Sequence, residues 1–194
     1  MKNRWLPGLA LLLFSLIAVM SAPSRGGADG AAHVRWDIIH VDFSTLTLSA
    51  GGRASAFAND QSSITLTGSG MFVAPAGDGK TSSAVTGGGT WETFDPGGRS
   101  TGSGTYSVTS LVGWTPAPGF LPPGFTDQIG DPTDTSPGLA VLRIAYSDGT
   151  AGILVLSCTF GGTPPAVFEG VTASKGFVDY WIRQEENFTD FHVR

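Results

Sequence analysis

The sequence pattern that most constrains the fold is a repeated alternation of apolar and polar residues in short segments. Branched and aromatic residues recur at alternate positions, and Gly, Pro and Asp end the segments, which is typical of β-strands. After residue 33, no stretch shows a 3.6-residue apolar period over three helical turns. Glycine, at 28 of 194 residues, is about twice as frequent as its usual ~7%. The sequence therefore predicts an all-β fold.

The predicted strands are separated by short turn sequences. In chain order the strands cover residues 34–43, 45–49, 53–58, 63–73, 84–94, 102–114, 139–147, 152–160, 166–173, 176–183 and 188–193. Turn sequences rich in Asn, Asp, Pro and Gly lie at 59–61, 95–98 and 147–150. Because such short connections favour antiparallel neighbours, we expect a mostly antiparallel meander.

A short motif, Gly-x-Gly-x-aromatic, occurs three times and ends at Phe72, Trp91 and Tyr106. Alternate residues of a strand lie on one face, so each copy places two glycines and one ring on the same side. Strand glycines mark bends or close approach of another chain segment, and a ring can fill the space that they leave. We expect the three rings to converge on one buried face, to line a ligand site and to form the wall of a small barrel, with a β-sandwich as the alternative.

The beginning of the chain has the pattern of an export signal. Two basic residues precede an apolar run at 9–20, and small residues follow it, so residues 1–22 are predicted to be a signal peptide. The apolar run is shorter than the ~20 residues that span a membrane, so no stable span is expected after signal removal. Residues 23–33 are expected to be a disordered leader and 34–194 a single all-β domain. The protein is thus predicted to be secreted or periplasmic.

A Pro-rich stretch at 115–137 interrupts the strand pattern, with six prolines and no Lys or Arg. Long loops of this kind are often functional, and we expect a flap over an opening or edge of the sheet, with a solvated loop as the alternative. Phe120, Leu121 and Phe125 are expected to contact the sheet, and the two Phe rings to line a ligand site. The acidic residues of the stretch do not have the spacing of a calcium-binding loop and are expected at its exposed rim: Asp127, Asp131 and Asp134.

Two pairs of titratable residues are candidates for acid–base chemistry. His40 and Asp42 lie two apart and therefore on one face of a strand, where they can pair. Glu169 and Asp179 form a second candidate pair, although nothing in the sequence fixes their separation. Ordinary structural roles for all four residues are the alternative.

The sequence contains no zinc signature, phosphate-binding loop or dinucleotide fingerprint, so neither a metal site nor a cofactor is expected. The chain has eleven Lys and Arg residues and sixteen Asp and Glu residues, and the basic residues form no cluster. This composition argues against a nucleic-acid partner.

Three segments resemble a group of uncharacterised exported bacterial β-proteins. They are the Gly-rich strand at 87–91, GLAVLRIAYSDG at 138–149 and VFEGVTASKGFVDYW at 167–181. The resemblance covers most of residues 45–193 and implies an exported β-domain. It brings no established activity, so no catalytic residue is transferred from it.

The function that best fits these features is a secreted, cofactor-free binding or structural domain that takes a small apolar ligand. The alternative is a small barrel enzyme, an isomerase or hydrolase, that uses His40 with Asp42 or Glu169 with Asp179. The two hypotheses differ in geometry, because catalysis requires such a pair within hydrogen-bond reach inside a pocket.

Overall fold

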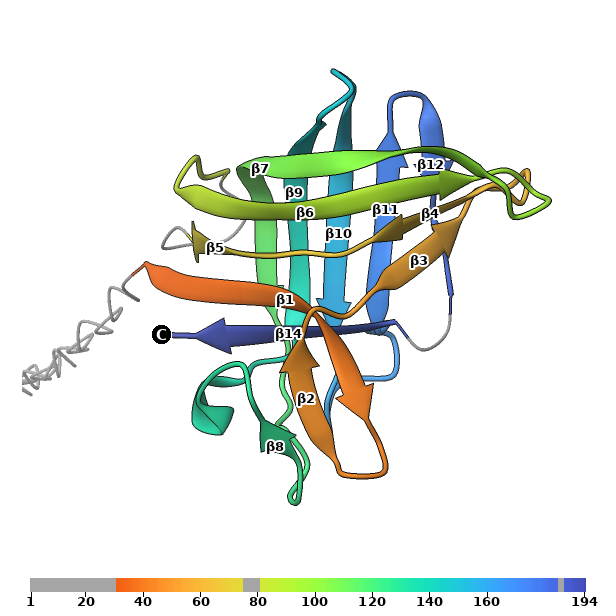
Figure 1. The fold of residues 1–194 in the computed structure, drawn as a ribbon. Coiled ribbons are helices and arrows are strands. Elements are labelled where there is room, and N and C mark those ends of the chain that lie inside the picture. Colours follow the sequence, from red (N-terminus) through yellow and green to blue (C-terminus); the bar gives the residue numbers. More distant parts are fainter. Residues whose placement is uncertain (1–30, 75–80, 185–186) are drawn as a thin grey trace, which may run out of the picture.

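The computed structural model describes residues 31–74, 81–184 and 187–194 (Figure 1). The regular elements in these residues are strands and one short 3₁₀ helix, η1 (Pro132–Asp134), so the predicted all-β fold is confirmed. The predicted signal peptide, and the leader up to residue 30, lie outside the described residues. The first strand begins at Ala32, inside the range that the sequence assigned to the leader.

Fourteen strands occur among the described residues. Their bounds are β1 (Ala32–Asp42), β2 (Thr47–Ala50), β3 (Ala54–Phe57), β4 (Ser63–Leu66), β5 (Ser69–Ala74), β6 (Val85–Phe94), β7 (Ser100–Pro116), β8 (Thr126–Asp127), β9 (Gly138–Tyr146), β10 (Ala151–Cys158), β11 (Gly170–Lys175), β12 (Val178–Tyr180), β13 (Ile182–Arg183) and β14 (Phe188–Val193). The predicted strand 63–73 is divided into β4 and β5 at Gly68, whose φ of 154° is unfavourable for other residues.

The strands form one hydrogen-bonded sheet. Its main path is β12-β11-β10-β9-β7-β6-β5-β1-β2-β8, while β14 pairs with β1, and β4 connects β6 to β3 and so to β13. Among the described residues, every pairing is antiparallel except that of β2 with β8. The three predicted turns join antiparallel neighbours, which confirms the hairpins β3–β4, β6–β7 and β9–β10.

The sheet folds over on itself without closing into a barrel. In Figure 1, β1, β5, β6 and β14 run across β9, β10 and β11 behind them, and β7 passes from one layer to the other. Irregular register in β7, between Val108 and Ser110 and between Leu111 and Gly113, allows it to bend. β12 pairs with β11, but after Trp181 the next strand, β13, pairs with β3 instead. The ring of hydrogen-bonded strands that a barrel requires is therefore interrupted here. The barrel prediction is therefore wrong, and two separate sheets are not observed either.

One hydrophobic core lies between the two layers. It contains the three rings of the glycine motif, Phe72, Trp91 and Tyr106, which are 1%, 4% and 4% exposed. A Cβ atom added to Gly102 or Gly104 of β7 would lie 3.3 or 3.0 Å from the Trp91 side chain of β6. The glycines of one strand thus make room for the ring of the next strand. The burial of the three rings agrees with the motif, and their contact with a ligand stays a prediction.

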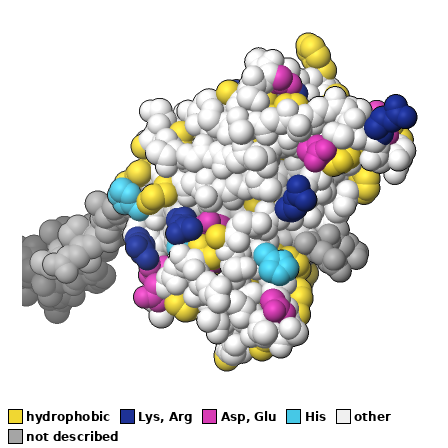
Figure 2. Space-filling model, viewed as in Figure 1, with side chains coloured by type: hydrophobic (Ala, Val, Ile, Leu, Met, Phe, Trp, Pro, Cys, Tyr) yellow, Lys and Arg dark blue, Asp and Glu magenta, His cyan; other side chains and the backbone are white. Residues whose placement is uncertain are grey.

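Most of the visible surface carries no charge. On the face drawn in Figure 2, charged side chains lie singly or in small groups among uncharged atoms. This agrees with a chain in which charged residues are only 14%. A concentration of charged groups in the interior is therefore exceptional in this molecule.

Candidate functional site

The Pro-rich segment 115–137 is attached to the sheet by backbone hydrogen bonds. The N–H of Thr126 donates to the carbonyl of Leu46 at 2.8 Å, where β8 begins to run parallel to β2. Further along, the N–H of Ser136 donates to the carbonyl of Phe191 in β14 at 2.9 Å. β8 and η1 consequently lie beside β2 and β14 in Figure 1. Backbone hydrogen bonds therefore hold the segment against β2 and β14.

An apolar pocket of about 270 Å³ lies where the segment meets β1 and β2. Its lining residues are Leu121, Pro122 and Phe125 of the segment, together with Ile39, Val41, Phe43, Leu48, Thr159, Phe160, Gly161, Glu169, Phe188 and Thr189. Phe125 therefore faces this pocket. Phe120 is not among the lining residues; its side chain is 59% exposed and its backbone pairs with Gly161.

Glu169 is the one titratable residue among those that line the pocket. Its Oε2 accepts hydrogen bonds from the N–H and hydroxyl of Thr159, at 2.5 and 3.1 Å. Its Oε1 accepts from the N–H of Thr189 at 2.8 Å, and the hydroxyl oxygen of Thr189 lies 3.3 Å from the same atom. Burial raises the pKa of Glu169 to about 7, although these hydrogen bonds act to lower it. The carboxyl group thus connects the end of β10 to β14 at the wall of the pocket.

A group of charged side chains lies beneath the same Pro-rich segment. Val34, Trp36 and Ile38 of β1 face the core, so Arg35 and Asp37 face the opposite side of the strand. There Arg35 donates to the carbonyl of Ile129 in the Pro-rich segment at 3.2 Å.

The neighbouring strand β14 adds two more polar residues on this covered face. Arg35 and Asp37 stand opposite His192 and Asp190 in the register of β1 with β14. Asp37, Asp190 and His192 are 1%, 0% and 2% exposed. β8 brings Asp127 onto them, and its side chain is 0% exposed. The Pro-rich segment and the two paired strands therefore enclose a buried polar cluster.

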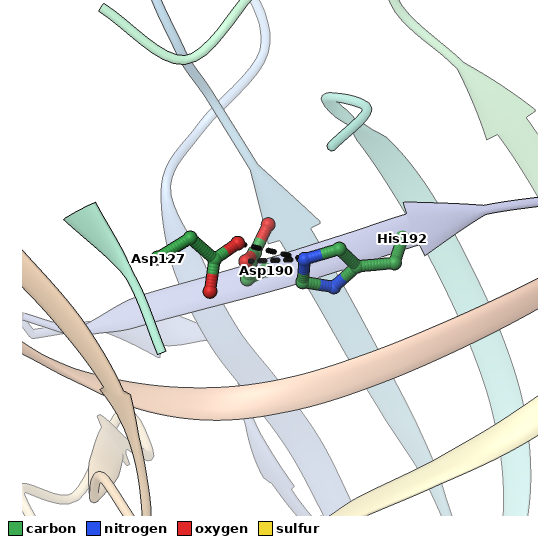
Figure 3. A group of neighbouring side chains, drawn as sticks. All are labelled: Asp127, Asp190 and His192. Carbon is green, nitrogen blue, oxygen red and sulfur yellow. Dashed lines mark hydrogen bonds and ion pairs between the residues drawn. The ribbon is translucent and has the colours of Figure 1, made fainter. Parts of the chain in front are cut away.

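Arg35, whose side chain is 42% exposed, borders this cluster and donates to Asp37 through hydrogen bonds of 2.7 and 3.0 Å. The Nε2 atom of His192 lies 2.7 Å from Oδ2 of Asp127 and 3.7 Å from Oδ2 of Asp190 (Figure 3). Neither oxygen of Asp190, nor Nδ1 of His192, has a hydrogen-bond partner among the described residues. Burial, reinforced by the charge of Asp127, raises the pKa of Asp190 to about 8.

In the described part of the chain, no hydrogen bond joins either predicted acid–base pair. His40 is exposed, and the Asp42 carboxylate accepts hydrogen bonds from the hydroxyl and N–H of Ser44, at 2.6 and 2.8 Å. These bonds lower the pKa of Asp42 to about 2. Glu169 is bonded to two threonines, whereas Asp179 is exposed in β12. The four residues do not assemble one site.

Asp127 does not lie at the exposed rim, where the sequence placed it. Its carboxylate is buried against His192, because the pairing of β8 with β2 turns alternate side chains of this stretch inward. Asp131 is exposed, and Asp134 is 28% exposed and bonded to Arg194 at 2.6 Å. The rim prediction is wrong for Asp127 and agrees with the exposure of the other two residues.

Sequence reasoning missed Asp190 and His192. A signal was present, because these two residues alternate with apolar or core-facing neighbours in β14, just as Arg35 and Asp37 do in β1. Such alternation indicates that the polar residues of each strand share a face. The pairing of the first strand with the last is not visible in the pattern, and this pairing creates the cluster.

Comparisons of the chain with protein-family models, curated proteins and solved structures found no match. In the part of the chain that the structure describes, no helix combines the length and apolar character that crossing a membrane requires. The interpretation of function therefore rests on the geometry of the molecule itself.

Proposed function

We propose that this protein binds a small, uncharged apolar ligand in the pocket between the Pro-rich segment and β1–β2. The observation that carries the proposal is the lining of the pocket, in which Thr159, Glu169 and Thr189 are the only polar residues. Ligand sites in proteins are typically concave and mostly apolar, with a few polar groups that fix orientation.

The polar groups of the pocket are already engaged, which favours an apolar ligand over a polar one. An ionised carboxylate has about four acceptor positions, and three are taken by the N–H and hydroxyl of Thr159 and the N–H of Thr189. The single hydroxyl hydrogen of Thr189 goes either to the carbonyl of Ser157, at 2.8 Å, or to Glu169, at 3.3 Å. A ligand therefore finds little free hydrogen-bonding capacity and gains its affinity from apolar contact.

Phe43 offers apolar surface that such a ligand would cover. Its side chain is 61% exposed although it lines the pocket, and its ring centroid is 5.5 Å from that of Phe188. Covering this surface is favourable by ~25 cal/mol for each Å² removed from water. The pocket thus combines a mostly apolar lining with one ring, Phe43, that is largely exposed to water.

A fluorescent apolar probe, N-phenyl-1-naphthylamine, tests the proposal. We expect saturable binding of one probe molecule per chain and at least tenfold weaker binding by Val41→Phe, whose larger side chain enters the pocket. Val178→Phe is the matched control, because Val178 is 39% exposed in β12 and does not line the pocket. Absence of saturable binding, or equal affinity of Val41→Phe and wild type, would contradict the proposal. Native mass spectrometry of protein from its own source then identifies the natural ligand by its mass.

The proposal includes export of the protein. It is supported by the basic residues and the apolar run within residues 1–22, which have the order of a signal peptide. Mass spectrometry of the mature protein should find an N-terminus at or next to residue 22. A mature protein that still begins at Met1 would contradict export by this signal.

A further inference from the structure

Three side chains that can each bind a metal ion converge beneath the Pro-rich segment. One potential ligand atom from each of Asp127, Asp190 and His192 lies within 4.8 Å of the other two. Figure 3 shows the two carboxylates and Nε2 of the imidazole directed toward one another. Asp190 and His192 come from one face of β14, and Asp127 reaches them from β8.

The protein leaves buried polar atoms of the cluster without partners among the described residues. Arg35 is the cation nearest to it in the register of the strands, but two hydrogen bonds commit it to Asp37. The carboxylates of Asp127 and Asp190 then share a single imidazole, in a site with almost no exposure to water. Buried carboxylates are costly unless they are paired or coordinate a metal, and neither oxygen of Asp190 has a hydrogen-bond partner among the described residues.

We propose that Asp127, Asp190 and His192 bind one divalent transition-metal ion, through Nε2 of the imidazole and one oxygen of each carboxylate. This assignment departs from the sequence analysis, which expected no metal. It does not depend on the apolar pocket, since Asp127, Asp190 and His192 are not among the residues that line that pocket.

The donor set selects the class of ion. Imidazole favours zinc and its neighbours in the first transition series over magnesium and calcium, which prefer oxygen alone. Ligand atoms around a tetrahedral zinc ion are roughly 3.4 Å apart, given metal–ligand distances near 2.1 Å. The distances from Nε2 of His192 to Asp127 and Asp190, 2.7 and 3.7 Å, lie on either side of this value. Small shifts of the two carboxylates would therefore admit the ion.

The ring of His192 is held in position and lies beside a surface pocket. A Cβ atom at Gly130 would lie 2.4 Å from Cδ2 of His192, so only glycine allows the segment to pack so closely on the ring. A surface pocket of about 180 Å³ lies beside the ring and is lined by His192, Arg35 and Ile129 among others. In this proposal the ion enters from the side of this pocket, and three protein ligands leave a further coordination position for water or another small ligand.

Cobalt(II) binding to protein stripped with EDTA tests the proposal, because cobalt reports its ligands by visible absorption. We expect one Co²⁺ per chain in the wild type, displaced by Zn²⁺, and at least tenfold weaker binding by Asp190→Asn and His192→Gln. Asp190→Asn keeps the shape of the side chain and should fold. Asp179→Asn and His40→Gln are matched controls at exposed positions, and they should bind like the wild type.

X-ray absorption at the zinc edge needs no variant and should show one imidazole among nitrogen and oxygen ligands. Zn²⁺ should also raise the Tm of the wild type and leave that of Asp190→Asn unchanged. The proposal is overturned if the stripped wild type binds no ion, because the cluster is then only a buried ion pair. It is equally overturned if the two cluster variants bind as tightly as the controls, because the ion then lies elsewhere.

Discussion

Trp91 is buried because two glycines of the neighbouring strand leave room for its ring. Its Nε1–H donates to the carbonyl of Thr105 at 3.1 Å, and its ring centroid is 5.7 Å from that of Tyr146. The ammonium group of Lys175 lies 4.2 Å from the same ring. Replacement of Trp91 by Ala should lower the free energy of unfolding by ~3–5 kcal/mol, since a large cavity cannot collapse between two sheet layers. Urea denaturation measures this change.

The control for this substitution is Trp181→Ala. Trp181 is 48% exposed between β12 and β13, so its loss should change the free energy of unfolding by less than ~1 kcal/mol. A Trp91→Ala variant as stable as the wild type would show that the ring is not part of the core.

Glu169 should make stability depend on pH. Burial raises its pKa in the folded protein to about 7, whereas an unfolded chain has the ordinary value near 4.5. Between these values the folded state holds the proton more tightly, so the contribution of Glu169 to stability is present below pH 4.5 and is lost as the pH rises toward 7. The free energy of unfolding of the metal-free wild type, relative to that of Glu169→Gln, should therefore fall as the pH rises from 4.5 to 7. Denaturation at a series of pH values measures it, and a difference that is constant with pH would exclude a raised pKa.

At the scale of elements, we expect the sheet to fold without the Pro-rich segment. The N–H of Ala117 donates to the carbonyl of Pro137 at 2.9 Å, so the two ends of the segment are adjacent. Replacement of residues 118–136 by a short Gly-Ser linker should preserve the β-sheet circular dichroism spectrum, because none of the removed residues belongs to the hydrophobic core. Binding of N-phenyl-1-naphthylamine should weaken at least tenfold, since Leu121, Pro122 and Phe125 are lost from the pocket. Failure of this protein to fold would make the segment part of the core, and unchanged probe binding would place the ligand site elsewhere.

Local patterns predicted the elements better than their assembly. Alternation and turn chemistry located most strands and three hairpins, because both depend on residues close in the sequence. The bend of β7 depends on register irregularities near Ser110 and Gly113, which single-strand alternation does not reveal. A closed barrel was therefore predicted where the sheet folds over.

In the candidate site, too, the features set by local sequence were predicted, and those set by the pairing of distant segments were not. Its cover, the segment 115–137, and Phe125 were recognised from local composition. The charged cluster was not recognised, because it exists only where β14 pairs with β1 and where β8 turns Asp127 inward. Glu169 was singled out, but its hydrogen bonds go to Thr159 and Thr189, which are distant from each other in sequence.

At the scale of the whole molecule, the two ends of the described chain are joined. The N–H of His33 donates to the carbonyl of Arg194, and the N–H of Arg194 to the carbonyl of His33, both at 2.9 Å. β1 lies between β5 and β14, so its central position in the sheet depends on the last residues of the chain. Pairing of the first strand with the last closes a very long loop, which costs conformational entropy of the chain. The contacts of β14 with β1 stabilise the fold only after this entropy has been lost.

Removal of residues 187–194 should therefore prevent stable folding. The deletion exposes one edge of β1, takes Phe191 (0% exposed) out of the core and leaves Trp114 without a ring whose centroid lies 4.7 Å away. Near-ultraviolet circular dichroism and proton NMR should show loss of fixed aromatic packing. The full-length variant Phe191→Ala separates the ring from the strand: it keeps the backbone pairing and should fold with a free energy of unfolding lower by ~3–5 kcal/mol. A truncated chain with the native near-ultraviolet spectrum would show that β1 holds its place without β14.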